Sequence, residues 1–235
     1  ITKPKGDFDM NKPYIVCHMM TSVDGRIDCA MTEQLAGVED YYRTLDSFGA
    51  PSRVSGRVTA MLEMACAGEF KSEKHDPAMK ETFYKATSAD GYEIVADTRG
   101  TLLWDGYNDE GRPLLILMSE KAEKEYLAYL ERLHISYIVC GAEHIDLARA
   151  CELLKSEFGV SRMAVVGGGH INAGFLAAGL LDEVRILVGS GIDGRGGNGA
   201  VFDGLPQNRP VTLLVLSDVK KFESGAVWLR YKVKK

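Results

Sequence analysis

Short apolar runs alternate with segments of helical periodicity along almost the whole chain. Strands are predicted where apolar and often β-branched residues lie together, at 14–20, 113–120, 136–141, 162–166 and 182–189, and a strand that ends in a polar turn is predicted within 92–104. Helices are predicted where apolar residues recur with helical spacing, at 37–49, 121–134 and 145–159. A strand, a turn at Gly56 and a helix are predicted within 52–68. Because strands and helices alternate in this way, the chain is predicted to be a layered α/β protein.

Both ends of the chain and one internal segment depart from this alternation. Residues 211–233 contain two β-rich runs joined by a polar turn, which predicts an antiparallel pair at one edge of the sheet. Residues 69–91 are charged and weakly periodic, and are predicted to be a surface excursion that either covers a site or decorates the surface. Residues 1–11 are predicted to be a flexible extension, and 12–235 a single domain, since no repeat or linker interrupts them.

Composition and charge exclude some classes of function. The chain has 235 residues, 46% of them hydrophobic, and a formal net charge of -5, so it has no basic excess to neutralise nucleic-acid phosphates. No run approaches the roughly 20 apolar residues of a membrane span, and the N-terminus lacks the apolar core of a signal peptide. The five cysteines are scattered without metal-ligand spacing. We therefore expect a cytoplasmic protein with free thiols, no metal ion and a small-molecule ligand.

Three consecutive glycines, Gly167 to Gly169, lie between a predicted strand and a predicted helix in MAVVGGGHINAGFLAAGLLDEV at 163–184. The N-terminus of a helix presents unpaired N–H groups and the positive end of its dipole, and glycine lets a phosphate approach the backbone. The spacing differs from the dinucleotide motif GxGxxG. By themselves the glycines leave two interpretations open, a phosphate site and a tight turn between strand and helix.

A second strand-to-helix corner has the same design. In VSGRVTAM at 54–61, Gly56 is followed by Arg57 and Thr59 at the start of the predicted helix. A guanidinium and a hydroxyl group at this place can bind phosphate oxygens, although a surface arginine and a capping threonine would look the same. Two such corners in one α/β sheet predict a ligand that carries more than one phosphate.

Five motifs in order along the chain resemble the reductase domain of bacterial riboflavin-biosynthesis deaminase–reductases, in the dihydrofolate-reductase-like superfamily. They are TSVDGRI at 21–27, GRVT at 56–59, VADTRGTL at 95–102, GGGHINAGFLAAGLLDEV at 167–184 and GIDGRGGNGAVFDG at 191–204. The resemblance implies a dihydrofolate-reductase-like α/β fold. Its central sheet would be mostly parallel, with helices on both faces and the antiparallel pair at the C-terminal edge.

The resemblance also implies a binding site for NADPH. Its residues would be Thr21, Gly56, Arg57, Thr59, Thr98, Gly167, Gly168, Gly169, His170, Ile171 and Asn172. Arg57 and Thr98 would lie on the adenosine phosphate side, where a cation favours the 2′-phosphate of NADPH over NADH. The segment 168–172 would wrap the diphosphate and the nicotinamide ribose. For His170, a role as diphosphate donor and a capping or surface role are both open.

On the substrate side the resemblance implies reduction of a phosphoribosylamino-pyrimidine, with hydride delivered to the anomeric carbon of the ribose. The catalytic candidates are Asp24 and Glu63, and the proton would come from Asp24, Glu63 or water. An ordinary Asp-Gly turn would also explain Asp24, and an exposed helix glutamate would explain Glu63. In the riboflavin enzymes a glutamate usually precedes the final glycine pair, where this chain has Gly167.

Two other functions stay open from the sequence. One is reduction of dihydrofolate or of another small molecule such as a phosphorylated pterin, for which Glu39 or Asp40 would supply the acid. The other is a nucleotide-binding protein without turnover, or one that uses a flavin, since the glycine corners would persist in it. The resemblance further implies a homodimer, which the apolar C-terminal strands would support.

Overall fold

The computed structural model describes residues 11–106, 108–109, 111–197 and 199–234. The predicted extension at 1–11 lies outside the described residues except for Asn11. The strands are β1 (Tyr14–Thr21), β2 (Ser52–Gly56), β3 (Thr82–Tyr84), β4 (Glu93–Ala96), β5 (Asn108–Asp109), β6 (Arg112–Met118), β7 (Ser136–Val139), β8 (Arg162–Gly167), β9 (Glu183–Val188), β10 (Leu214–Lys221) and β11 (Val227–Val233). The helices are α1 (Cys29–Thr32), α2 (Val38–Ser47), α3 (Arg57–Glu63), α4 (Lys124–Arg132), α5 (Leu147–Ser156) and α6 (Gly169–Ala177).

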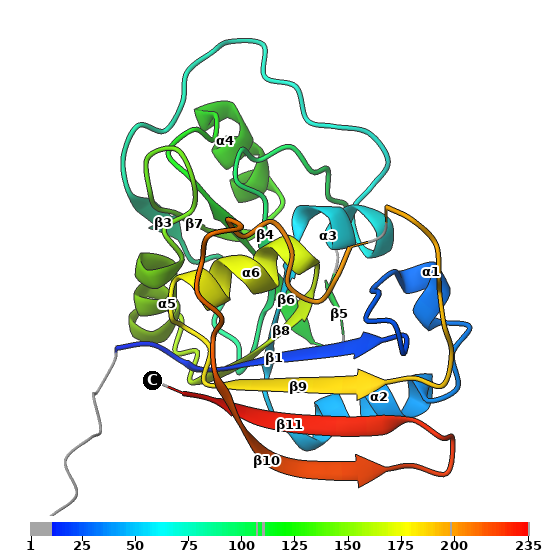
Figure 1. Cartoon of the computed structure of the whole chain (residues 1–235). Helices are drawn as coiled ribbons and strands as arrows, with labels where there is room; N and C mark the ends of the chain where they lie inside the picture. The colour runs from blue at the N-terminus through cyan, green and yellow to red at the C-terminus, as the bar shows by residue number, and fades with distance from the viewer. Residues whose placement is uncertain (1–10, 107, 110, 198, 235) are drawn as a thin grey trace, which may run out of the picture.

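Ten strands form one continuous sheet in the order β10-β11-β9-β1-β8-β2-β4-β6-β7-β3, and β5 pairs with β6 beside it (Figure 1). The strands from β9 to β7 in this order are parallel. At one edge, β11 is antiparallel to both β9 and β10, and this confirms the predicted C-terminal pair. At the other edge, β3 is antiparallel to β7. The predicted α/β class and mostly parallel sheet are therefore confirmed.

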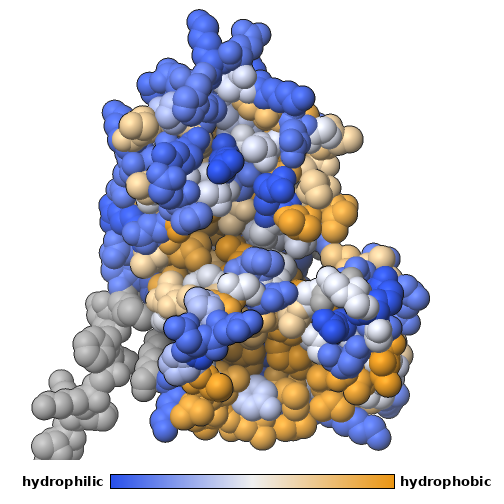
Figure 2. All heavy atoms as spheres, turned by 45° about the horizontal axis from the view of Figure 1, so that its top comes forward, coloured by the Kyte–Doolittle hydropathy of each residue, from blue (hydrophilic) through white to orange (hydrophobic). Residues whose placement is uncertain are grey.

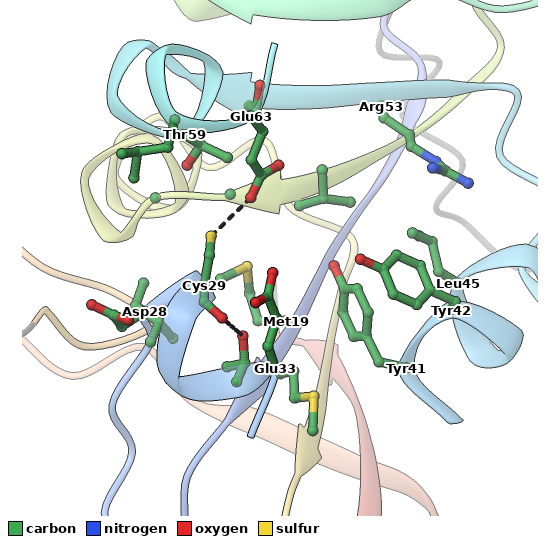
Figure 3. Close-up of a pocket in the computed structure, with 18 of the residues that line it drawn as sticks. Met19, Asp28, Cys29, Glu33, Tyr41, Tyr42, Leu45, Arg53, Thr59 and Glu63 are labelled. Atoms are coloured by element: carbon green, nitrogen blue, oxygen red, sulfur yellow. Dashed lines mark hydrogen bonds between the residues drawn. The ribbon is translucent and has the colours of Figure 1, made fainter. Parts of the chain in front are cut away.

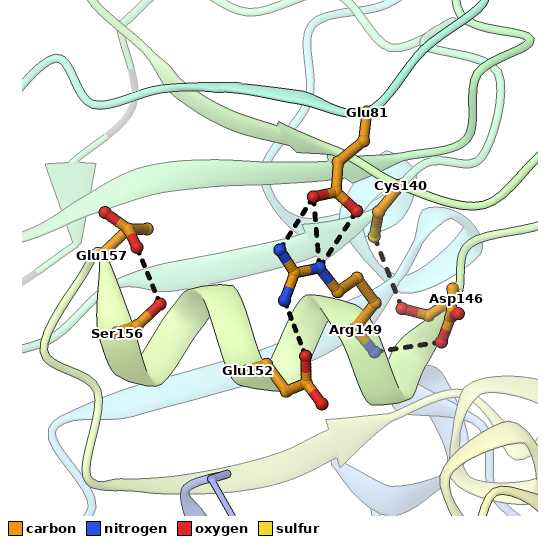
Figure 4. A network of polar contacts seen from close by, with 7 residues as sticks. All are labelled: Glu81, Cys140, Asp146, Arg149, Glu152, Ser156 and Glu157. Carbon is orange, nitrogen blue, oxygen red and sulfur yellow. Dashed lines mark hydrogen bonds and ion pairs between the residues drawn. The ribbon is translucent and has the colours of Figure 1, made fainter.

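Part of the predicted surface excursion at 69–91 is this edge strand β3. The rings of Tyr84 in β3 and Tyr137 in β7 lie 5.8 Å apart between centroids. The carboxylate of Glu81 accepts hydrogen bonds from the Arg149 guanidinium of α5 at 2.9–3.2 Å, which fastens the same segment (Figure 4). Aromatic and β-branched residues favour pairing, but periodicity cannot reveal so short a run among charged neighbours.

Helices cover both faces of the sheet, as predicted. Cys17 and Leu115 belong to the core that α5 and α6 cover, whereas Ile116 and Met118 belong to the core under α4. Helix α2 covers Val16 on this second face. Figure 1 shows α5 and α6 in front of the sheet and α2 behind it. Because both faces are buried, central strands are continuous apolar runs such as LLILM in β6.

The strand order creates a switch point at the carboxyl ends of β8 and β2. These neighbouring parallel strands are followed by helices on opposite faces of the sheet, α6 after β8 and α3 after β2. In open α/β sheets, ligands bind outside the carboxyl ends of the strands where the connections diverge in this way. Both glycine corners that the sequence singles out lie at this point.

A buried histidine gives the fold a pH dependence that the sequence does not reveal. His18 in β1 is 1% exposed, and its Nε2 lies 3.3 Å from both Tyr41 O and Thr44 Oγ1. Burial lowers the pKa of His18 to about 4. The imidazole is therefore neutral in the folded protein at neutral pH, whereas in the unfolded chain it titrates near its ordinary pKa of about 6.5.

We expect His18 to reduce the free energy of unfolding by about 3 kcal/mol as the pH falls from about 6.5 to about 4. In this window the unfolded chain binds a proton that the folded protein excludes. The stabilisation is complete above the unfolded pKa and is lost on acidification. Urea unfolding across this pH range measures it, with His18→Gln as the variant that cannot titrate. Equal pH slopes for wild type and His18→Gln would contradict the prediction.

Candidate active site

A cleft of about 670 Å³ opens at the carboxyl ends of β1, β2 and β8. Helices α1, α2 and α3 form its walls, and the three strands supply residues such as Met20, Ser55 and Gly167. Figure 3 shows Glu63 pointing from α3 toward Cys29 of α1. The cleft thus joins segments that are far apart in the sequence, at the place where the sheet topology favours a ligand.

Each of the three consecutive glycines is required for its own structural reason. A Cβ on Gly167 would lie 2.9 Å from Thr59 Oγ1, and a Cβ on Gly169 would lie 2.4 Å from Ala200 O. Gly168, just before α6, has a φ of +84°, which favours glycine. Gly167 and Gly168 also line the cleft. A glutamate at position 167, as in the riboflavin enzymes, would have to displace Thr59.

The N-terminus of α6 is open to an anionic group. Among the described residues, the N–H groups of Gly169, His170 and Ile171 have no hydrogen-bond acceptor. These groups and the helix dipole suit a phosphate. Asn172 is fully buried, and its Nδ2 donates to Val201 O at 2.7 Å, which holds the following loop against the helix. The Asn172 Oδ1 atom has no partner in the described part of the chain.

The second glycine corner lies beside the first. Gly56 precedes α3, and a Cβ on it would lie 3.6 Å from the Cβ of Ile171 in α6. Thr59 lines the cleft. Arg57, the first residue of α3, is partly exposed, and its Nη1 lies 3.7 Å from Glu69 Oε1. The two predicted corners are therefore adjacent, as a ligand with more than one phosphate requires.

Thr98 follows the neighbouring strand β4, in a turn that Asp97 builds. Asp97 is fully buried, and its Oδ2 accepts hydrogen bonds from Thr101 N at 2.6 Å and Leu102 N at 2.9 Å. Burial raises the pKa of Asp97, while these N–H groups act in the opposite sense. Thr98 O accepts a hydrogen bond from Ser119 N at 2.9 Å. Since β4 pairs with β2, Thr98 lies next to the Arg57 corner but outside the cleft lining.

Asp24 joins two loops. Its Oδ1 accepts hydrogen bonds from Ser22 Oγ at 2.6 Å and Asp193 N at 3.0 Å, and its Oδ2 accepts one from Gly194 N at 3.0 Å. The Ser22 hydroxyl, followed by these N–H groups, lowers the pKa of Asp24 well below its usual range. Thr21, just before this loop, is buried at the end of β1. Asp24 is not among the described residues that line the cleft, and its catalytic role stays a prediction.

Glu63, the other catalytic candidate, lies in the cleft wall at the end of α3. Its Oε1 accepts a hydrogen bond from Cys29 Sγ at 2.8 Å, which ties α3 to α1 (Figure 3). Burial, followed by the bond to Glu63, raises the pKa of the Cys29 thiol to about 12. The thiol is therefore a neutral donor at physiological pH, and it orients the carboxylate without reacting.

Sequence reasoning missed several polar residues of the cleft. Arg53 and Ser55 flank buried Val54 in β2, so they share one face of the strand and both line the cleft. The alternation in SRVSG before a glycine corner is a usable signal for this pair. Glu33 and Tyr42 also line the cleft, but no local pattern marks them. They meet β2 only through the tertiary fold.

Glu39 and Asp40, the candidates for the acid of a dihydrofolate reductase, lie outside the cleft lining. Asp40 is buried, forms an ion pair with Arg43 and accepts a hydrogen bond from Ser224 Oγ at 2.6 Å. Neither Asp40 nor Glu39 belongs to the described residues that line the cleft. Neither residue can therefore act in the cleft as the acid of a dihydrofolate reductase.

The cysteines are all free thiols. Among the described residues, no group of three or more His, Cys, Asp or Glu side chains is placed to hold a metal ion. In the same part of the chain, no helix is both long and apolar enough to cross a membrane. The cytoplasmic location stays a prediction from the sequence.

Comparison with known proteins gives matches over most of the chain. The RibD C-terminal domain family matches residues 13–228. The 2,5-diamino-6-ribosylamino-4(3H)-pyrimidinone 5′-phosphate reductase of Methanothermobacter thermautotrophicus is 27% identical over 183 residues, 75% of this chain and 77% of the relative. The reductase of the same name from Archaeoglobus fulgidus is 26% identical over 201 residues, 82% of this chain and 87% of the relative. A solved pyrimidine reductase-like protein of Corynebacterium diphtheriae has a TM-score of 0.66 at 16% identity, covering 96% of this chain and 93% of that chain, and confirms the predicted fold.

Proposed function

The chain belongs to the RibD C-terminal domain family, and from this we propose that it is an NADPH-dependent reductase of a phosphorylated ribosylaminopyrimidine. The family match over 13–228 carries the proposal, and two relatives are named as reductases of such a compound. Support comes from two adjacent strand-to-helix corners beside one cleft at the switch point of the sheet. NADPH, when bound, supplies a hydride, which the proposed reaction places on the anomeric carbon of the ribose.

The donors at the two corners fit NADPH. The unpaired N–H groups at the start of α6 bind the diphosphate, and Gly168 leaves the backbone open to it. Arg57 binds the 2′-phosphate, with Thr98 on the adjacent strand end. Thr59 and the loop that Asn172 holds complete the site.

The substrate lies in the cleft beside this cofactor site. Arg53 is the cationic residue among those that line the cleft, and it forms an ion pair with Asp46 at 3.2 Å. Its fork of N–H donors suits the substrate phosphate as well. Glu63 or a water molecule in the cleft delivers the proton, and Asp24 keeps the neighbouring loops in place.

Turnover tests the proposed function directly. Loss of NADPH absorbance with ribosylaminopyrimidine 5′-phosphates, and not with dihydrofolate, is the expected result. Oxidation with dihydrofolate alone would favour the alternative reductase. NADPH binding without oxidation by any of these compounds would favour a nucleotide-binding protein without turnover.

We expect Arg57→Ala to reduce the preference for NADPH over NADH by about 10- to 100-fold, because a charge-assisted contact to the 2′-phosphate is lost. NADH affinity should change little. Titration of nicotinamide fluorescence with each nucleotide measures the ratio. Arg132→Ala, at the end of α4, is the matched control. An unchanged ratio in Arg57→Ala would place the 2′-phosphate elsewhere.

Residues 12–235 are proposed to form a single domain that associates as a homodimer. One sheet connects the elements along the described chain from β1 to β11. Every residue of β10 is exposed at the sheet edge, including Leu216 (53%) and Val219 (51%), and Val211 just before it is 86% exposed. Figure 2 shows apolar surface over the lower part of the molecule, where the C-terminal strands lie. An open edge strand with an apolar surface is a ready site for a second copy.

A further inference from the structure

The cleft is rich in acceptors of hydrogen bonds. Glu33 lines the cleft, is exposed, and has no hydrogen bond or ion pair with any described residue, whereas Glu63 Oε1 already accepts from Cys29. Figure 3 shows Glu63 at the end of α3 and Glu33 just after α1, with Tyr41 and Tyr42 on α2 at another side of the cleft. Burial raises the pKa of Tyr42, and the nearby charges of Glu63 and Glu33 add to this rise. The charged residues that line the cleft are Asp28, Glu33, Asp46, Glu63, Glu93 and Arg53.

A buried hydroxyl in the same cleft points to a polar ligand independently of these charges. Ser55 is 1% exposed, and its Oγ has no hydrogen-bond partner among the described residues. Ser55 lines the cleft and is in register with Gly167 of β8, directly below the glycine corner. An unsatisfied buried hydroxyl destabilises the folded protein. A ligand that accepts its hydrogen bond would remove this cost.

The two forms of an aminopyrimidine ring differ at the edge that a carboxylate can recognise. A 2-amino-4-oxo ring presents two adjacent donors there, the ring N3–H and the 2-amino group. The corresponding uracil presents N3–H beside a 2-oxo acceptor, which repels a carboxylate oxygen. Carboxylates accept hydrogen bonds and cannot donate them when ionised. The uncommitted oxygens of Glu33 therefore match the amino form and oppose the oxo form.

Building on the proposed function, we propose that Glu33 selects the 2,5-diamino-4-oxo form of the substrate over the 5-amino-uracil form, while Ser55 donates a hydrogen bond to the 4-oxo group. Glu33 then determines specificity, because only the amino form satisfies both carboxylate oxygens. Ser55 contributes affinity without discrimination, because both rings carry the 4-oxo group. Within the described part of the chain, neither side chain forms a hydrogen bond that a substitution would break.

The test is the ratio of kcat/KM for the two ribosylaminopyrimidine 5′-phosphates, diamino over uracil, with saturating NADPH. The wild type should favour the diamino substrate by about 10- to 100-fold, the range for a hydrogen bond to a charged group. Glu33→Gln should remove or invert this preference, because an amide can accept from N3–H and donate to the 2-oxo group. Glu39→Gln makes the same chemical change on α2 outside the cleft and should leave the ratio unchanged.

The variant Ser55→Ala tests whether the Ser55 hydroxyl binds substrate or only stabilises the fold. It should raise KM about 10-fold for both substrates, leave their ratio unchanged and leave the melting temperature equal or higher, since it removes an unsatisfied buried hydroxyl. Equal wild-type activity on both rings, or an unchanged ratio in Glu33→Gln, would overturn the specificity while the reductase function stands. If neither ring is reduced, the proposed function and this inference fail together.

Discussion

The variant Gly169→Ala is expected to lose measurable NADPH binding. A Cβ at this position would lie 2.4 Å from Ala200 O and 3.0 Å from Asp203 Cβ, within the loop that Asn172 holds against α6. A backbone carbonyl cannot yield as the tip of a flexible side chain can. Either this loop leaves the start of α6 or the helix shifts, and both movements displace the N–H groups proposed to bind the diphosphate.

Titration of nicotinamide fluorescence with NADPH measures this effect. Overpacking should also lower the free energy of unfolding by about 1–3 kcal/mol, so each variant is titrated below its own melting temperature. Gly196→Ala is the matched control, because no heavy atom lies within 4 Å of a Cβ there and its φ is not positive. Wild-type affinity in a folded Gly169→Ala protein would contradict a diphosphate site at the start of α6.

Leu216→Asp is expected to convert the proposed homodimer into monomers. Leu216 is exposed in the middle of β10, the edge strand whose residues are all exposed in the single chain. In an isologous dimer the variant would bury a carboxylate from each copy in an apolar contact, and an unpaired buried charge costs several kcal/mol. The folded chain itself should be unaffected, because this side chain is not part of its core.

Sedimentation equilibrium at micromolar concentration distinguishes the two states. Met79→Asp is the control, since Met79 is 69% exposed, lies outside the C-terminal strands and has a positive φ that aspartate tolerates. A monomeric wild type would rule out the homodimer. A Leu216→Asp protein that stays dimeric would place the interface on another surface.

The three glycines Gly167 to Gly169 show what local sequence can predict and where it leaves alternatives open. A β-branched run, three glycines and an alanine-rich segment predict strand, turn and helix, and β8 and α6 confirm that order. The sequence leaves a phosphate site and a tight turn as alternatives. The structure shows that packing alone already demands glycine at 167 and 169, through Thr59 and Ala200. Packing and ligand access therefore act on the same residues, and sequence inspection cannot separate them.

Asp24 and Glu63 show the same limit on the catalytic side. Asp24 sits in the first of the motifs that resemble a family and Glu63 lies one turn beyond the second, but only the folded chain shows Asp24 bonded to the backbone at 193 and 194. Glu63 instead faces a cleft whose opposite wall comes from α1 and α2. The identity of a carboxylate says nothing about its partners, and the partners decide whether it holds loops together or contacts a ligand.

The sequence by itself determined the α/β class, the order of most elements, the antiparallel C-terminal pair and the two glycine corners. These follow from side-chain periodicity and from backbone preferences, which are local properties of the chain. The tertiary structure alone decided the strand order, the burial of His18, the edge strand β3 and the placement of Glu33 and Ser55 in one cleft. These depend on contacts between segments far apart in the chain, and no local pattern encodes which strands become neighbours.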